Sequence, residues 1–256
     1  EAFGTVAYAI NHYAKKSGSK TERIELRFPT QEEYILSTLE KVLKKNHGRV
    51  RLVSISHISS TPSVLLPVQA IQAICRRYKA LLVVDGAHAF GQIELNLTRL
   101  DPDIYVANGH KWFFSSRGSG IVYVKKNVRK LLQFSTIPHY FRRGKNSFIA
   151  DESNVYDFSA LLTMATALEF RRLVGGEGKI AQYNRKLASK AADILTQKWK
   201  TNILIRDYAR QNLSMINVAL PLYHHMLVRT VVERLMQQQR TFLIYFYHAG
   251  YYYARI

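Results

Sequence analysis

Two residues that could act on one small molecule, Asp85 and Lys111, each follow a short apolar run. The run LLVVD ends on Asp85, and IYVANGHK ends on Lys111. Such runs, when bounded by turn residues, are typical of buried parallel strands, and ligands of these sheets bind at the carboxyl ends of the strands. The pattern predicts that carboxylate and amine share one crevice, roughly 5–10 Å apart, because neighbouring strands lie about 4.8 Å apart.

An acid and an amine across such a gap suit a flat aromatic cofactor. A lysine that forms a Schiff base with pyridoxal phosphate (PLP), with an aspartate that binds the protonated pyridine nitrogen, needs this arrangement. A salt bridge at the edge of the sheet fits the same spacing. The spacing alone leaves both interpretations open.

The motifs around these residues carry a family resemblance. VDGAHA around Asp85, NGHKW around Lys111 and the RGSG that follows resemble the class V aminotransferase family, and within it the branch named for isopenicillin N epimerase. The resemblance implies a fold-type I enzyme with PLP as cofactor. In that family the aspartate binds the pyridine nitrogen, the residue three positions later binds the phenolate oxygen, and the lysine carries the Schiff base. These roles fall on Asp85, His88 and Lys111.

The same resemblance implies further cofactor contacts. Phe3 stands where related enzymes place an aromatic ring over the cofactor face, although ordinary core packing would suit it as well. Ser59 or Ser60, in the phrase ISHISS, could hydrogen-bond the cofactor's oxygen. Asn108 and His110 precede the lysine as in the family's N-x-H-K motif, where the lysine's neighbours reach the phosphate. These residues make up the predicted PLP site, while the small-residue turn with which the family cups the cofactor phosphate has no counterpart in this sequence.

A metal centre is the other chemistry that these histidines permit. His88 and His110 could join Asp85 as ligands from two strand ends, but the adjoining Lys111 argues against a metal ion there. Cys75 is the only cysteine, so neither an internal disulfide nor a cysteine-cluster metal site is possible. We therefore expect no metal.

The last residues, YYYARI, resemble the family strand whose arginine binds the substrate carboxylate. That arginine is Arg255, and its planar guanidinium suits two-point binding of a carboxylate. A surface cation near a frayed end is the simpler alternative. The resemblance thus implies an amino-acid substrate.

One stretch departs from the family pattern. Related enzymes carry a glycine-threonine pair that reaches across a dimer to the neighbour's phosphate, and the resemblance therefore implies a homodimer. Here Asn154 and Val155 stand in place of that pair, ahead of the matching Asp157 and Ser159. Valine has no hydroxyl to donate, so this departure bears on phosphate affinity.

The periodicity of apolar residues predicts an α/β fold with a mainly parallel sheet, followed by a partial α+β unit. We expect helices at residues 3–17, 31–46, 67–80, 177–200 and 224–240. We expect strands at residues 22–28, 49–58, 80–86, 120–126, 214–221 and 241–256. Thr30 and Glu33 are placed as a capping box for the second helix.

The order of elements, read with the family resemblance, implies three regions. Residues 1–176 are expected to form a PLP-binding large domain whose N-terminal part is missing, residues 177–200 a connecting helix, and residues 201–256 an incomplete small domain. The chain begins on Glu1 and stops within an apolar run, so both ends look cut.

The formal net charge of +19 would ordinarily indicate a polyanionic partner. The basic residues are spread over several helices, and no nucleic-acid-binding motif accompanies them, so solvated faces explain them better. No apolar stretch approaches the roughly 20 residues that span a bilayer, and no signal peptide opens the chain. We expect a cytoplasmic protein without a nucleic-acid or membrane partner.

Taken together, the motifs predict a PLP-dependent enzyme that acts at Cα or Cβ of an amino acid or a cysteine-derived substrate. Epimerisation, C–S cleavage and transamination all suit the site. A catalytically inactive relative that serves as a scaffold subunit is the alternative, supported by the missing opening segment and by Val155.

Overall fold

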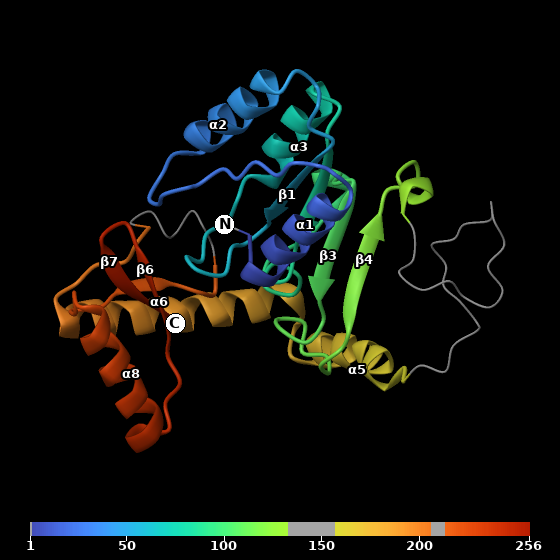
Figure 1. Cartoon of the computed structure of the whole chain (residues 1–256). Helices are drawn as coiled ribbons and strands as arrows, with labels where there is room; N and C mark the ends of the chain where they lie inside the picture. The colour runs from blue at the N-terminus through green and yellow to red at the C-terminus, as the bar shows by residue number, and fades with distance from the viewer. Residues whose placement is uncertain (1, 133–156, 206–212) are drawn as a thin grey trace.

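The computed structural model describes residues 2–132, 157–205 and 213–256, and the element labels are those of Figure 1. Within these ranges four strands form a sheet in the order β1-β2-β3-β4. They are β1 (Leu52–Ser56), β2 (Leu81–Asp85), β3 (Ile104–Asn108) and β4 (Gly120–Val124). The first three are parallel and β4 is antiparallel to β3. The predicted α/β class with a mainly parallel sheet is confirmed.

Helices α2 (Glu32–Lys45) and α3 (Val68–Arg77) contribute the apolar sides of amphipathic helices to the core of this sheet, and the short α4 (Leu97–Leu100) contacts α3. Helix α1 (Gly4–Lys16) precedes them and buries none of its residues. The core beneath α2 and α3 includes Leu43, Leu82 and Val84, each at most 1% exposed. Cys75 lies there as a buried small residue, and burial raises the pKa of its thiol to about 12.

A second sheet comes from the end of the chain. It has the antiparallel order β5-β7-β6, with β5 (Asn217–Ala219), β6 (Ile244–His248) and β7 (Tyr251–Arg255). Helix α8 (His225–Gln239) lies beside it. Ala219 and Tyr253 pack into the same buried cluster as the residues of the first sheet. The two sheets therefore share a continuous core.

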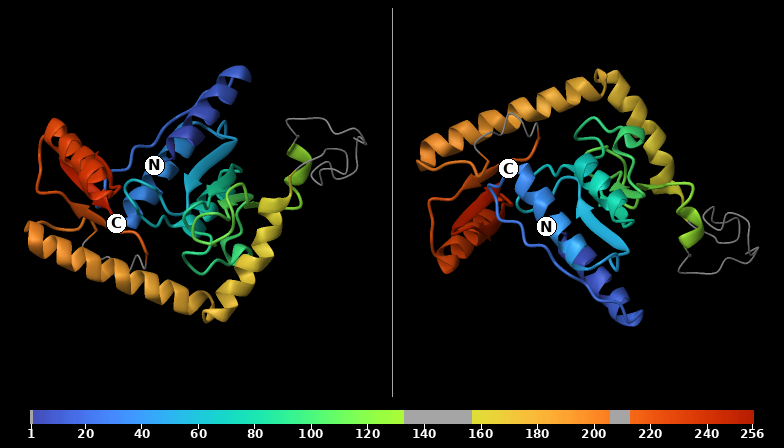
Figure 2. Two further views of the ribbon diagram at one scale, coloured as in Figure 1. Left: turned by 90° about the horizontal axis from the view of Figure 1, so that it is seen from below. Right: turned by 90° about the horizontal axis from the view of Figure 1, so that it is seen from above.

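The short helix η1 (Arg129–Leu131) follows β4. Two longer helices, α5 (Ser159–Leu173) and α6 (Gly176–Trp199), then connect the first sheet to the second. Figure 2 shows α5 and α6 meeting at an angle, with α6 running from the first sheet toward the second. None of the described helices is both long and apolar enough to cross a membrane.

Three local predictions need correction. Residues 22–28 form no strand, although their burial alternates and Phe28 is 2% exposed. Helix α2 begins after Gln31, whose side chain makes no cap bond, so the predicted capping box does not form. Residues 241–256 form two strands rather than one, because Ala249 and Gly250 adopt positive φ angles of 48° and 94° and turn the chain.

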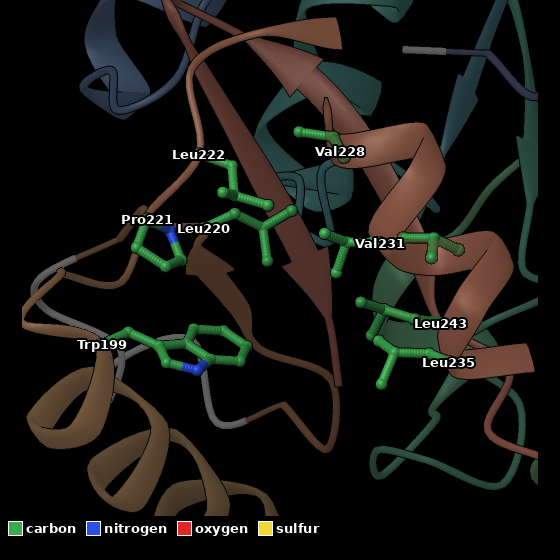
Figure 3. Close-up of a pocket in the computed structure, with 9 residues that line it drawn as sticks. Trp199, Leu220, Pro221, Leu222, Val228, Val231, Leu235 and Leu243 are labelled. Atoms are coloured by element: carbon green, nitrogen blue, oxygen red, sulfur yellow. The ribbon is translucent and has the colours of Figure 1, made fainter. Parts of the chain in front are cut away.

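An apolar hollow of about 260 Å³ lies between the end of α6, helix α8 and the segment that follows β5 (Figure 3). Its walls are made by Trp199, Leu220, Pro221, Leu222, Val228, Val231, Val232, Leu235 and Leu243. None of these side chains is charged, and none belongs to the predicted site. The hollow is therefore a packing feature of the second sheet and its helix.

Candidate active site

The strands β2 and β3 place Asp85 and the Lys111 loop at the same edge of the first sheet. Asp85 pairs with Val106 in the parallel register, and the amide of Gly86 donates to the carbonyl of Val106 at 2.7 Å. The chain then leaves β3 after Asn108 and reaches Lys111 three residues later. Figure 1 shows this carboxyl end of β3 directed toward α5. The arrangement of strands agrees with the sequence-based prediction.

A tight turn after β2 fixes the carboxylate of Asp85. Its Oδ1 accepts a hydrogen bond from the amide of Ala87 at 2.9 Å. A Cβ at Gly86 would lie 2.1 Å from the ring of Tyr105, so only glycine lets the turn pass over that ring. Tyr105 is fully buried and shares a 3.0 Å hydrogen bond with His57. Burial, and then the charge of Asp85, raise the pKa of this tyrosine.

His88 lies between the indole of Trp112 and the amine of Lys111. The Trp112 Nε1 atom is 3.3 Å from His88 Nδ1, and Lys111 Nζ is 3.4 Å from His88 Nε2. An indole nitrogen only donates, so Nδ1 is assigned as the acceptor and the neutral ring carries its proton on Nε2. Burial, followed by the charges of Lys111 and Arg255, lowers the pKa of His88 to about 3. His88 is therefore a neutral donor that faces the lysine.

The amine of Lys111 is surrounded by groups that shift its protonation. Partial burial is the largest effect and lowers the pKa of Lys111, and the positive charge of Arg255 lowers it further. The residue as a whole is still exposed. Asp85 acts in the opposite direction. A free amine is the nucleophilic and proton-accepting form of lysine, so this environment makes Lys111 reactive nearer neutral pH.

Arg255 brings the second sheet to the same place. Its Nη1 atom donates to the carbonyl of Ser60 at 3.0 Å and to the Ser60 hydroxyl at 2.7 Å. The loop that carries Ser60 is fastened by Asn217, whose side-chain amide exchanges two 2.9 Å hydrogen bonds with the backbone of Ser63. The structure therefore unites Asp85, His88, Lys111 and Arg255 around one space.

The two serines of the ISHISS phrase have different surroundings. Ser59 is fully buried, and its hydroxyl donates to the carbonyl of Pro62 at 2.6 Å. That placement does not favour the predicted cofactor contact of Ser59. Ser60 instead presents its hydroxyl to Arg255. His57, buried with a pKa lowered to about 4 by burial, is a packed core residue.

The remaining predicted cofactor residues lie at the edge of this group. Asn108 ends β3 opposite Gly120, and His110 Nδ1 lies 3.4 Å from the carbonyl of Ser119. Phe3 immediately precedes α1 and is 56% exposed, and α1 buries none of its residues. The roles assigned to these three residues stay predictions.

Some site-related residues lie outside the described ranges or were missed. Asn154 and Val155 fall in the undescribed range 133–156, whereas Asp157 accepts from the amide of Ser159 at the start of α5. No three His, Cys, Asp or Glu side chains gather as a metal site among the described residues. Sequence reasoning missed Gln92, which is 1% exposed and donates to the carbonyl of His88 at 2.5 Å. A polar residue after a turn gave no signal of that contact.

The family model described as aminotransferase class-V matches residues 6–237. The chain belongs to the class-V aminotransferase family. Its fold is that of fold-type I PLP-dependent enzymes, shown by solved structures such as the cysteine desulfurase from Thermococcus onnurineus NA1. That structure has a TM-score of 0.74 at 19% identity and covers 96% of this chain and 63% of its own. A variant of C-DES with glycine covalently linked to the PLP cofactor has a TM-score of 0.76 at 19% identity, covering 99% and 67%.

Two curated relatives of this class-V chain are cysteine-related. Hercynylcysteine sulfoxide lyase of Schizosaccharomyces pombe is 27% identical over 263 residues, covering 100% of this chain and 66% of the lyase. L-cysteine desulfhydrase of Arabidopsis thaliana is 33% identical over 212 residues, covering 79% of this chain and 46% of the desulfhydrase. The chain thus spans about half to two thirds of the length of these relatives.

Proposed function

We propose that this class-V chain provides the catalytic groups of a PLP-dependent enzyme that acts at Cα and Cβ of an amino acid, with C–S cleavage of a cysteine-derived substrate as the reaction. The observation that carries the proposal is the meeting of Asp85, His88, Lys111 and Arg255 at one sheet edge. The names of the cysteine-related relatives support the choice of substrate class.

The donor set fits PLP. Asp85 offers a carboxylate for a protonated pyridine nitrogen, and the neutral His88 offers an Nε2–H donor for the phenolate oxygen. Lys111 has the lowered pKa that a covalently binding amine requires. By analogy with the family's N-x-H-K motif, Asn108 and His110 would contact the phosphate of the cofactor. When bound, PLP supplies an electron sink for carbanion chemistry at the substrate.

The protein's own groups then divide the remaining work. Arg255 would bind the substrate carboxylate, because its guanidinium already donates to the hydroxyl and carbonyl of Ser60 and can share those donors with an anion. Lys111 would accept a proton at Nζ, since burial and Arg255 both favour its neutral form. His88 would keep that amine oriented through its 3.4 Å contact.

The experiment is a product assay on the purified chain with added PLP. We expect sulfide, pyruvate and ammonia from L-cysteine, or a sulfenic acid, pyruvate and ammonia from the S-oxide of a cysteine thioether, and no release from the Lys111→Ala variant. Lys125→Ala, which alters a lysine paired with Asp101, is the matched control and should keep the release rate. Cofactor binding without any C–S cleavage would redirect the proposal to epimerisation or transamination, as in the isopenicillin N epimerase-like branch.

Several wider expectations belong to the same proposal. We propose a homodimer, supported by the exposed apolar side chains Tyr8 (77%) and Leu162 (72%) on α1 and α5, and sedimentation velocity would test it. The division at residues 176 and 200, a cytoplasmic location and the lack of a nucleic-acid partner stay predictions. A chain that binds no PLP at all would favour the inactive scaffold.

A further inference from the structure

Arg171 is a buried cation that the proposed chemistry does not use. It lies in α5, is 1% exposed, and directs its guanidinium toward the loops that follow β2 and β3. A fully buried charge is costly unless it is paired and hydrogen-bonded. The groups that satisfy it therefore show what it holds in place.

Its hydrogen bonds join the two loops of the candidate site. Nη2 donates to the carbonyl of Gly91 at 2.9 Å, and Nη1 donates to the carbonyl of Trp112 at 2.7 Å. Gly91 has φ +85°, and a Cβ there would lie 2.7 Å from the backbone of Trp112 and Phe113. The turn that carries His88 and the loop that carries Lys111 thus pack backbone to backbone, and the Arg171 guanidinium hydrogen-bonds both of them.

The aromatic residues after Lys111 also pack on this guanidinium. The Arg171 Cζ atom lies 5.2 Å from the ring centre of Phe113 and 4.9 Å from that of Phe114. Phe114 has φ +70°, a conformation that a bulky side chain rarely adopts. The cation therefore supports a strained part of the loop next to the lysine.

Helix α6 fixes the guanidinium from the other side. Glu177 accepts from Arg171 Nε at 2.6 Å and pairs with its Nη2 atom. Thr163, one turn into α5, adds a second attachment, because its hydroxyl lies 2.8 Å from that of Ser115 and accepts from the amide of Ser116. The Lys111 loop is consequently held by the helices behind it as well as by its own strand.

We propose that Arg171 is a positioning residue that holds the Lys111 loop against the His88 turn and so keeps the Lys111 amine aligned with His88 and Asp85. Its hydrogen bonds among the described residues go to the carbonyls of Gly91 and Trp112 and to Glu177, so it acts on the loops and not on the Lys111 amine itself. This inference rests on the proposed function for its catalytic meaning. The effect of Arg171 on the surroundings of the Lys111 amine can be measured on the protein without any cofactor.

The test measures the reactivity of Lys111 in the cofactor-free protein. Acetic anhydride labels only neutral amines, and mass spectrometry of the Lys111 peptide gives the labelling midpoint as a function of pH. The groups that face this amine are Asp85, His88 and Arg255. In the wild type we expect a midpoint below that of an ordinary lysine. In Arg171→Lys, which keeps the charge but loses the planar fork, the loop should shift and the amine should lose part of the burial that lowers its pKa, which raises the midpoint by at least about half a pH unit.

A second readout concerns cofactor capture. We expect Arg171→Lys to retain its helical circular dichroism and yet form the borohydride-trapped PLP adduct on Lys111 at least about tenfold more slowly, because small misplacements of a reacting group are costly in rate. Glu177→Gln, which loosens the guanidinium from its exposed side, should shift both readouts in the same direction by a smaller amount and serves as the variant if Arg171→Lys does not fold.

Two controls separate positioning from stability. Arg172→Lys changes the exposed neighbouring arginine, and Val228→Ala removes core volume from α8, far from the loop in sequence and sheet. Both should leave the Lys111 midpoint and capture rate unchanged. A wild-type midpoint in a folded Arg171→Lys, or an equal shift in Val228→Ala, would overturn the inference. A wild type that captures no PLP would defeat the proposed function alone, since the labelling midpoint would still decide the role of Arg171.

Discussion

The two sides of the candidate site are held in different ways. On the side of the first sheet, the Asp85 turn and the Lys111 loop are fastened through buried backbone carbonyls, glycines with no room for a Cβ, and Arg171. On the side of the second sheet, a single cation, Arg255, reaches in from the last strand and rests on Ser60. The first side, which we call the rigid side, is held by many fixed contacts. The second, which we call the exchangeable side, presents the charge of Arg255, whose hydrogen bonds to Ser60 a substrate anion could replace.

This difference suggests a division of tasks. A covalently bound ring tolerates little movement of its lysine and its carboxylate, so the first side holds the two loops through several backbone contacts. A substrate must enter and leave, so its carboxylate partner should make bonds that an anion can replace. The hydroxyl and carbonyl of Ser60 satisfy this condition, since they are neutral acceptors for a charged donor.

The largest expected effect comes from breaking the rigid side at Asp85. Asp85→Asn should lower the rate of C–S cleavage by on the order of 10²–10³-fold, as for other losses of a charge partner within a site. Because Asp85 raises the pKa of Lys111, the same variant should lower the labelling midpoint of that lysine. Glu94→Gln, an exposed acid on the same stretch, is the control and should change neither. Full activity in Asp85→Asn would contradict the assignment.

A smaller and different effect is expected on the exchangeable side. Arg255→Met should raise KM for the amino acid by about 10- to 100-fold, the range expected for losing a charge-assisted hydrogen bond, with kcat changed much less. The Lys111 pKa should rise, since Arg255 lowers it. Steady-state kinetics over a range of substrate concentrations makes the measurement, with the exposed Arg234→Met as control. An equal fall in kcat and no change in KM would show that Arg255 does not bind the ground-state carboxylate.

Acid should lower the free energy of unfolding, because His57 and His88, next to the Asp85 turn, have lowered pKa values in the folded chain. His57 stays neutral in the folded chain until its pKa of about 4, whereas a histidine in the unfolded chain takes up a proton below about pH 6.5. The unfolded state therefore binds more protons between these values, and the free energy of unfolding falls as the pH drops through that window, by up to about 3 kcal/mol. His88 acts in the same direction.

Urea unfolding at a series of pH values would measure this loss. His57→Gln removes one titrating group and should flatten the pH dependence between pH 6.5 and 4, while the exposed His12→Gln should not. An unchanged pH dependence in His57→Gln would show that this histidine is not held neutral by burial.

Most elements were predictable because apolar periodicity records which face is buried. It found the strands that carry Asp85 and precede Lys111, and the long helix α6. It failed at residues 22–28, where Ile24, Leu26 and Phe28 do face the core in alternation. Alternation reports one-sided burial and cannot report whether a neighbouring strand is present. There the amide of Phe28 instead donates to the His248 ring at 2.8 Å.

The candidate site was predictable where chemistry follows directly after a strand. Asp85, His88 and Lys111 come together because β2 and β3 are adjacent and parallel. Arg171, Gln92 and Asn217 gave no such signal, since each acts on backbone atoms brought close only by the tertiary fold. The choice of Ser60 over Ser59 likewise depends on loop geometry that the sequence phrase does not encode.

The most direct test of the central claim is to locate covalently bound PLP on the purified chain. After addition of PLP and reduction with borohydride, peptide mass spectrometry should find the adduct on Lys111, together with a visible absorption band that borohydride removes and that Lys111→Ala lacks. No uptake by the wild type, or an adduct on another lysine with the band intact in Lys111→Ala, would contradict the account.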